Sequence, residues 1–259
     1  MSKYVFLLKT QLSQIATYRE DLVFNWLFKL FQMLVVYALW SISQQEPEEL
    51  SRLFVYYTLF FLFFDSFTTA KISRWMSKDI MSGNLSTYLL KPINYPITLW
   101  IKQIALIVAR VIIPIVLFLI FLFIRPDIAA PSSIINLVVF IISTIMCMVI
   151  WNLFVTIIGL FSFWINEVSQ LQNVINLLLN IVIGRYIPLY LFPENLQNLI
   201  ALTPANYLGG FQIQAYQGFA TSEQIVQGFF VMSIWTLVFT IFAWFLYSKG
   251  VKVYEANGS

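Results

Sequence analysis

Ionisable side chains inside apolar stretches are the residues of this chain most open to a chemical role. Lys29, Asp65 and Arg110 each fall within a long hydrophobic run. A charge in such a run costs free energy, so it either serves a function or is satisfied locally. These three residues are therefore candidates for a functional site, with a snorkelling cation or a buried structural pair as the alternatives.

Catalytic and metal-binding motifs are missing from the sequence. The chain has no histidine, and Cys147 is its only cysteine, which excludes imidazole chemistry and a disulfide within the chain. No G-x-x-x-x-G-K-[ST], H-E-x-x-H or G-x-S-x-G motif occurs. We therefore expect that the chain is not an enzyme, that it has no catalytic or metal-binding residue, and that it binds no cofactor itself.

The composition is that of an integral membrane protein. Hydrophobic residues make up 60% of the 259 positions and charged residues only 10%, whereas soluble domains are about one quarter charged. A spanning helix needs roughly 20 mostly apolar residues. Such stretches lie at about residues 22–42, 53–70, 104–124, 134–158, 174–191 and 229–247. The sequence thus predicts an all-α, polytopic fold of six transmembrane helices in a single domain over residues 1–259.

The cations predict how these spans are oriented. Lysine and arginine gather at both chain ends and in the connection between the second and third spans, whereas the connections on the opposite side carry few. The cations on the rich side are Lys3, Lys9, Arg19, Lys71, Arg74, Lys78, Lys91, Lys102, Lys249 and Lys252. Because cytoplasmic loops are enriched in these residues, both termini are expected in the cytoplasm.

Two further segments are too apolar for ordinary solvated connections. Within residues 1–20, Val5, Leu8, Leu12 and Ile15 share one helical face, which is typical of a helix lying on the membrane surface. This helix is either an anchor or a mechanical part. Residues 192–227, on the outer side, combine apolar residues with Pro, Gly and Asn, which favours short helices that dip back toward the bilayer.

The cytoplasmic connection at residues 71–102 has a pattern of its own. We expect a short helix over residues 72–81, a break at Gly83, an apolar patch at residues 88–90 and another break before Pro92. Exposed Met81, Leu85 and Leu89 beside two lysines would suit docking into a groove of a soluble partner. The alternative is an ordinary interhelical loop.

Three stretches carry a resemblance to a known family. They are "YREDLVFNWLFKLFQ" at the first span, "SGNLSTYLLKPINYP" after the second, and "YIPLYLFPENLQNLIALTPANYLGGF" between the fifth and the sixth. Together with the amphipathic N-terminal helix, they resemble the ABC-2 type permeases. More narrowly, the chain is similar to the small six-span permeases that work with a separate ATPase subunit.

This resemblance implies the other components of a transporter. It implies two permeases, identical or related, and two cytoplasmic subunits that bind ATP and Mg, in the cytoplasmic membrane of a prokaryote. It also implies a coupling helix between spans two and three and re-entrant outer helices between spans five and six. Membrane lipids are the other expected partner, and no nucleic acid is expected. We predict ATPase contact at Ser77, Lys78, Asp79, Ile80, Met81, Ser82, Gly83 and Lys91.

The function expected on this basis is export driven by ATP that the partner subunit hydrolyses. The sequence leaves the cargo open among amphipathic, lipid-like, peptide and drug molecules. An ion-coupled secondary transporter is a second hypothesis, although no inverted repeat is visible. A membrane scaffold that transports nothing is a third.

The depth of the three intramembrane charges predicts a pairing. Counted along their spans at about 1.5 Å per residue, all three lie at a similar distance below the cytoplasmic boundary. We expect Asp65 to pair with Arg110, because guanidinium matches carboxylate in a bidentate fork. Lys29 would then snorkel alone. The pair would either brace spans two and three during movement or serve as a static staple.

Overall fold

The structure is a computed structural model that describes residues 3–17, 19–42, 47–64, 71–165, 168–185 and 187–257. Within these ranges every regular element is a helix, and no strand is present. The all-α class predicted from the sequence is therefore confirmed for the described part of the chain.

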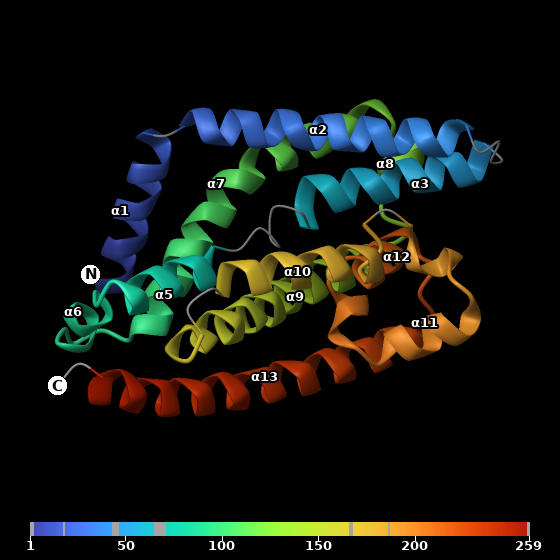
Figure 1. The fold of residues 1–259 in the computed structure, drawn as a ribbon. Helices are drawn as coiled ribbons and strands as arrows, with labels where there is room; N and C mark the ends of the chain where they lie inside the picture. Colours follow the sequence, from blue (N-terminus) through green and yellow to red (C-terminus); the bar gives the residue numbers. More distant parts are fainter. Residues whose placement is uncertain are drawn as a thin grey trace.

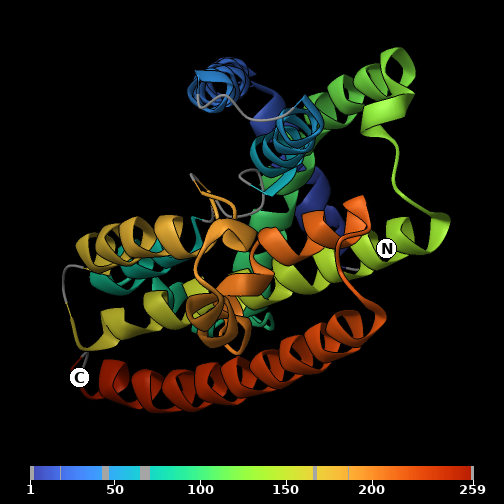
Figure 2. The ribbon, with the colours of Figure 1, turned by 90° about the vertical axis from the view of Figure 1, so that its right-hand side faces the viewer.

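Three long helices form the main body of the molecule: α7 (Tyr95–Ile124), α9 (Ile134–Leu160) and α13 (Ser222–Asn257). In length and composition each of them could cross a membrane. Helices α9 and α13 lie side by side in both ribbon views (Figures 1 and 2). Large apolar side chains point away from the protein along these helices, for example Phe123 on α7 and Trp244 on α13. Such a surface suits contact with lipid rather than with water.

Shorter helices occupy the other predicted spans. Helix α2 covers Arg19–Ile42, and α3 (Pro47–Leu59) continues into one turn of π-helix, η1 (Phe60–Phe64). The last residues of the second predicted span, 65–70, lie outside the described residues. Helices thus overlap each of the six predicted spans, but only α7, α9 and α13 are long and apolar enough to cross a membrane among the described residues, so the six-span topology stays a prediction. Helix α7 begins nine residues earlier than the span predicted at residue 104.

The predicted limits of the fifth span are wrong. Helix α10 covers Val168–Val182, so it begins before residue 174 and ends well before residue 191. Gly184 has a φ of +84°, a left-handed conformation that stops an α-helix and that glycine adopts at little cost. The hydroxyl of Tyr56 donates a hydrogen bond of 3.1 Å to the carbonyl oxygen of Gly184. This long-range contact holds the turn where the apolar composition alone suggested more helix.

Aromatic residues of α3 and η1 form much of the core between the helices. Tyr56, Tyr57, Phe60, Phe61 and Phe64 are all almost completely buried. Their rings contact one another in stacked and edge-to-face arrangements, with centroids about 5–6 Å apart. These rings therefore belong to the protein interior.

The two ends of the molecule differ in their elements. Both chain termini lie at one end, where the start of α1 (Lys3–Thr17) approaches α6 (Leu85–Leu89) and the last turns of α13 (Figure 1). We call this the coupling end. Helix α1 turns across the direction of α2, as the predicted interfacial helix would. Helix α5 (Ile72–Met81) leads from the body of the molecule to α6.

Short helices build the opposite end of the molecule. They are α8 (Pro126–Ala129), η3 (Leu189–Leu191), α11 (Glu194–Ala201), η4 (Pro204–Tyr207) and α12 (Gly210–Gln217). The amide of Gln212 donates a hydrogen bond of 2.7 Å to the carbonyl oxygen of Tyr207, and the Tyr216 hydroxyl donates one of 2.6 Å to Ala129. Helix α12 is buried against α9. Short helices therefore occur after residue 192 as predicted, and their insertion into the membrane stays a prediction.

Candidate functional site

Helix α5 lies against α9 with one side buried, and this contact is the basis of the candidate site. The buried residues recur at helical spacing and are Ile72, Ser73, Met76, Ser77 and Ile80. Gly159 of α9 faces this side. A Cβ atom at Gly159 would lie 2.9 Å from the Cα atom of Ser73, so the two backbones meet with no side chain between them. The sequence prediction of a short helix over residues 72–81 is confirmed to the residue.

Polar contacts connect α5 to further helices. The Ser73 hydroxyl donates a hydrogen bond to the side-chain oxygen of Gln172 on α10, and both residues are buried. The Tyr95 hydroxyl at the start of α7 donates a hydrogen bond of 3.0 Å to the Asp79 carboxylate. Buried hydrogen bonds of this kind hold helices in register, because a lost partner leaves a polar group without water. Helix α5 is therefore fastened to α7, α9 and α10 together.

Gly83 follows the end of α5 at the protein surface. It has a φ of +76°, which confirms the predicted break. Its carbonyl oxygen accepts a hydrogen bond of 2.9 Å from the hydroxyl of Tyr254, near the end of α13. The sequence offered no signal for this contact, which joins residues 171 positions apart.

The structure divides the predicted ATPase-contact residues into two groups. Ser77 and Ile80 are buried inside the chain, and Asp79 is half-buried beside Tyr95. The remaining predicted residues are exposed at the coupling end and are Lys78, Met81, Ser82, Gly83 and Lys91. Among the predicted contact residues of α5, those that a second protein could reach thus lie in its last turn.

One apolar residue predicted to be exposed is not. Leu85 is completely buried because α6 turns its first residue toward the protein. Met81 and Leu89 are exposed as predicted, and Leu90 is more exposed than either, with 88% of its surface accessible. Tyr88 packs its ring on Tyr95 with centroids 5.0 Å apart. The exposed apolar surface therefore consists mainly of Met81 and Leu90.

The structure describes two of the three predicted intramembrane charges, Lys29 and Arg110. Lys29 and Arg110 are both buried, and the Trp26 indole, one turn before Lys29, donates a hydrogen bond of 2.9 Å to the carbonyl oxygen of Arg110. The two cations thus lie near one α2–α7 contact. The expectation that Lys29 snorkels is wrong, because only 1% of its surface is accessible. Asp65 lies outside the described residues, so its pairing with Arg110 stays a prediction.

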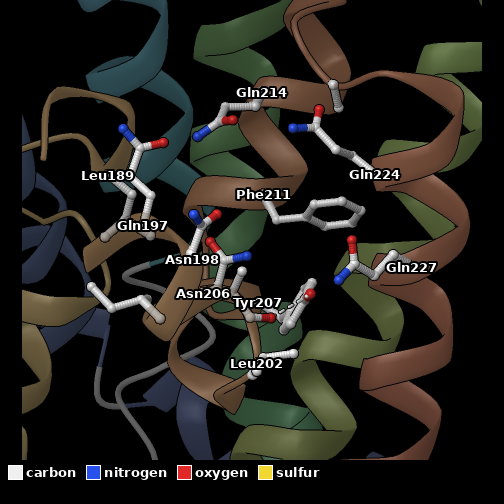
Figure 3. A pocket seen from close by; sticks show the side chains of 13 residues that line it. Leu189, Gln197, Asn198, Leu202, Asn206, Tyr207, Phe211, Gln214, Gln224 and Gln227 are labelled. Atoms are coloured by element: carbon white, nitrogen blue, oxygen red, sulfur yellow. Dashed lines mark hydrogen bonds between the residues drawn. The ribbon is translucent and has the colours of Figure 1, made fainter. Parts of the chain in front are cut away.

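A hollow of about 370 Å³ opens among the short helices at the end opposite the termini. Six of its thirteen lining residues carry primary amides, and they come from α11, η4, α12 and α13. These residues are Gln197, Asn198, Asn206, Gln214, Gln224 and Gln227. Figure 3 shows Gln214 and Gln224 approaching each other above the ring of Phe211, with Asn198 and Asn206 beside it. We call this hollow the amide pocket.

The amide pocket suits uncharged groups. Among the described residues, neither a carboxylate nor a cation lines this pocket. The Tyr207 hydroxyl donates a hydrogen bond of 2.8 Å to the carbonyl oxygen of Ala201. Burial raises the pKa of this hydroxyl, so it stays neutral at physiological pH.

A primary amide carries both donors and an acceptor, and Phe211 offers an apolar face. Part of this capacity is used inside the protein, because Gln197 donates a hydrogen bond to the Phe192 carbonyl oxygen. Gln224 likewise accepts one from the Thr221 backbone N–H. The sequence did not predict this pocket, because its residues are brought together only by the folding of four elements.

These features define a helical membrane protein with a short helix pair at one end and a folded polar segment at the other, an architecture suited to a transport permease. A family model described as "ABC-2 family transporter protein" matches residues 23–258, and the chain belongs to this family. It is therefore a membrane component of a transporter and not itself an enzyme. A search of curated proteins found no match to this chain.

The α5–α9 contact predicts a graded effect of bulk at Gly159. Alanine and then valine should lower stability progressively, because the nearest atom is backbone and overpacking costs about 1–3 kcal/mol. Cys147 is buried and is the only cysteine, so its reaction with a thiol-reactive dye during heating measures unfolding. As a control, Ile145→Val on the exposed side of α9 should change the midpoint little. Equal midpoints for Gly159→Val and wild type would contradict the contact.

The exposure pattern of the coupling end predicts a labelling pattern. Single cysteines at Met81 and Leu90 should react quickly with a membrane-impermeant maleimide, whereas cysteines at Ile80 and Leu85 should react slowly. Wild type, with Cys147 buried, provides the background. Comparing inside-out with right-side-out vesicles also tests orientation, since the cations predict reaction only from the cytoplasmic side. Fast labelling at residue 85 would show that α6 is not seated as described.

Proposed function

We propose that this chain is the permease subunit of an ATP-binding cassette exporter, driven by ATP that separate cytoplasmic subunits hydrolyse with Mg²⁺. The observation that carries the proposal is the position of α5, which has one side buried in the membrane helices and its last turn exposed. A soluble subunit that pushes on this turn would move α5 as a rigid piece. The family membership supports the same reading.

The contacts of α5 support a role in passing movement from the ATPase subunits to the membrane helices. Its contacts with Gly159, Gln172 and Tyr95 reach three membrane helices, so a displacement of α5 cannot be absorbed by one of them alone. Packed helices shift between discrete arrangements rather than deform continuously. Movement of the ATPase subunits would therefore be converted into a movement of the helix bundle.

Charge supports a cytoplasmic position for the coupling end. Lys78, Lys91 and Lys252 are all exposed there, and the amide pocket at the other end has no cation in its lining. By the positive-inside rule both termini would face the cytoplasm of a prokaryotic cell. Two permeases, identical or related, and two ATPase subunits would complete the transporter.

The amide pocket supports the final step of export. It lies at the end that would face outward, and its neutral donors and acceptors suit a cargo with uncharged hydrogen-bonding groups. Residues 192–227 around it would form the re-entrant outer helices of the permease.

Disrupting the exposed turn of α5 is expected to detach the ATPase subunit. In the double variant Lys78→Glu/Met81→Asp, an exposed cation is reversed and an exposed apolar anchor becomes charged. An apolar anchor commonly contributes about 2 kcal/mol to an interface, so binding should weaken by roughly 30-fold or more. Co-purification of the ATPase with the permease and vanadate-sensitive transport in vesicles are the two measurements.

A matched control keeps this test specific. Lys252→Glu reverses an exposed cation near the end of α13 and should leave both co-purification and transport near wild type. Full ATP-driven transport by the double variant would refute docking at α5. Transport by the wild type that depends on an ion gradient and not on ATP would instead favour a secondary transporter and would refute the proposed function.

A further inference from the structure

A second hollow, of about 350 Å³, lies at the coupling end between α1 and the junction of α6 with α7. Three cations reach it from three separate segments: Lys3 from α1, Lys91 from the junction and Lys102 from α7. Tyr4 and Tyr88 also contribute to the lining. We call this hollow the lysine pocket.

Tyr88 contacts two of the three lysines. The Lys102 ammonium is 3.3 Å from the Tyr88 hydroxyl, and the Lys91 ammonium is 5.7 Å from the centroid of the same ring. The Lys3 ammonium donates a hydrogen bond to the carbonyl oxygen of Pro92, next to Lys91. Tyr4 completes the connection, because its hydroxyl accepts a hydrogen bond of 3.4 Å from the backbone N–H of Asn94. The pocket is thus the place where α1 is fastened to the rest of the chain.

The lysine pocket has an excess of positive charge. Among the described residues, no carboxylate forms an ion pair with any of its three lysines, and no acidic residue belongs to its lining. The nearby Asp79 carboxylate accepts a hydrogen bond from Tyr95 instead. Three like charges around one hollow repel one another, and a bound anion would remove that repulsion.

The chemistry around the pocket favours an anion attached to an apolar body. Phe6 belongs to the lining, and 69% of its surface is accessible. Leu7 and Ile93 add further apolar surface to the lining. On α7, Lys102 is followed at once by the long apolar run from Ile104, which places the pocket at the depth where lipid headgroups lie.

We propose that the lysine pocket binds the phosphate group of an anionic membrane lipid, and that this lipid secures α1 to the α6–α7 junction. The phosphate oxygens would accept hydrogen bonds from the three lysines, and the lipid chains would lie along the apolar residues of α1. The lipid is a structural ligand of this pocket, separate from the cargo. The inference does not depend on ATP-driven transport.

The experiment uses the purified full-length chain in a neutral detergent. Phosphatidylglycerol is added in steps, retained lipid is counted by native mass spectrometry, and unfolding is followed through the reaction of Cys147 with a thiol-reactive dye. We expect phosphatidylglycerol to be retained and to raise the unfolding midpoint, and phosphatidylcholine to do neither. Inorganic phosphate at millimolar concentration is the third arm, because it carries the same anionic group without the apolar body.

The variants separate this pocket from general attraction to a basic surface. Lys91→Gln/Lys102→Gln removes two cations from the pocket, and Lys9→Gln/Lys252→Gln removes two exposed cations elsewhere that are not in its lining. A lysine beside an anionic lipid contributes about five-fold in affinity, so the pocket variant should bind phosphatidylglycerol about 25-fold more weakly. The control variant should bind it within about two-fold of wild type, because no lining cation is lost.

Three outcomes would overturn the proposal. Equal loss of binding in the two double variants would show attraction to the whole basic surface instead of a site. An equal rise of the midpoint with inorganic phosphate would show that the pocket takes a free anion and that the lipid body adds nothing. Retention of phosphatidylcholine to the same extent as phosphatidylglycerol would show that the phosphate and the lysines do not select for net negative charge.

Discussion

The close approach of α5 to α9 at Gly159 is the contact on which the rest of the arrangement depends. With no side chain at this position, the Ser73 backbone lies almost directly on the α9 backbone. That distance brings the Ser73 hydroxyl within reach of Gln172 on α10. Small residues are the usual way for membrane helices to approach closely, because lipid offers no hydrophobic force to press them together. The position of α5, and of the surface at its exposed turn, follows from this one contact.

Hydrogen bonds between buried polar groups connect several elements of the interior. Away from water, a hydroxyl or amide must find its partner within the protein. The Trp100 indole donates to the Thr156 hydroxyl at 3.0 Å, and the Gln212 amide donates to Tyr207. These bonds join α7 to α9 and α12 to η4, so the few polar residues of the core specify which elements are neighbours. The aromatic residues of α3 and η1 fill the space around them.

The two ends differ in charge, and the difference corresponds to different chemistry. At the coupling end, exposed lysines lie beside Met81 and Leu90, and a lysine-lined hollow connects α1 to α7. At the opposite end, primary amides line a neutral pocket that is held by the fold of α11 and α12. Cations at one end suit anionic lipid and a soluble partner, whereas neutral amides at the other suit a ligand without charge.

Local signals in the sequence determined the helical class and the position of several elements. Helical spacing with a glycine break predicted α5 and the break at Gly83, and the short helices predicted within residues 192–227 include α11. Such signals act between residues a few positions apart, so the sequence carries them directly. Only the tertiary structure decided the end of α10 at Gly184, the burial of Leu85 and the bond from Tyr254 to Gly83. The amide pocket and the lysine pocket were likewise decided only by the tertiary structure. Each of these features depends on residues that are far apart in the chain and meet only through packing, which no local pattern records.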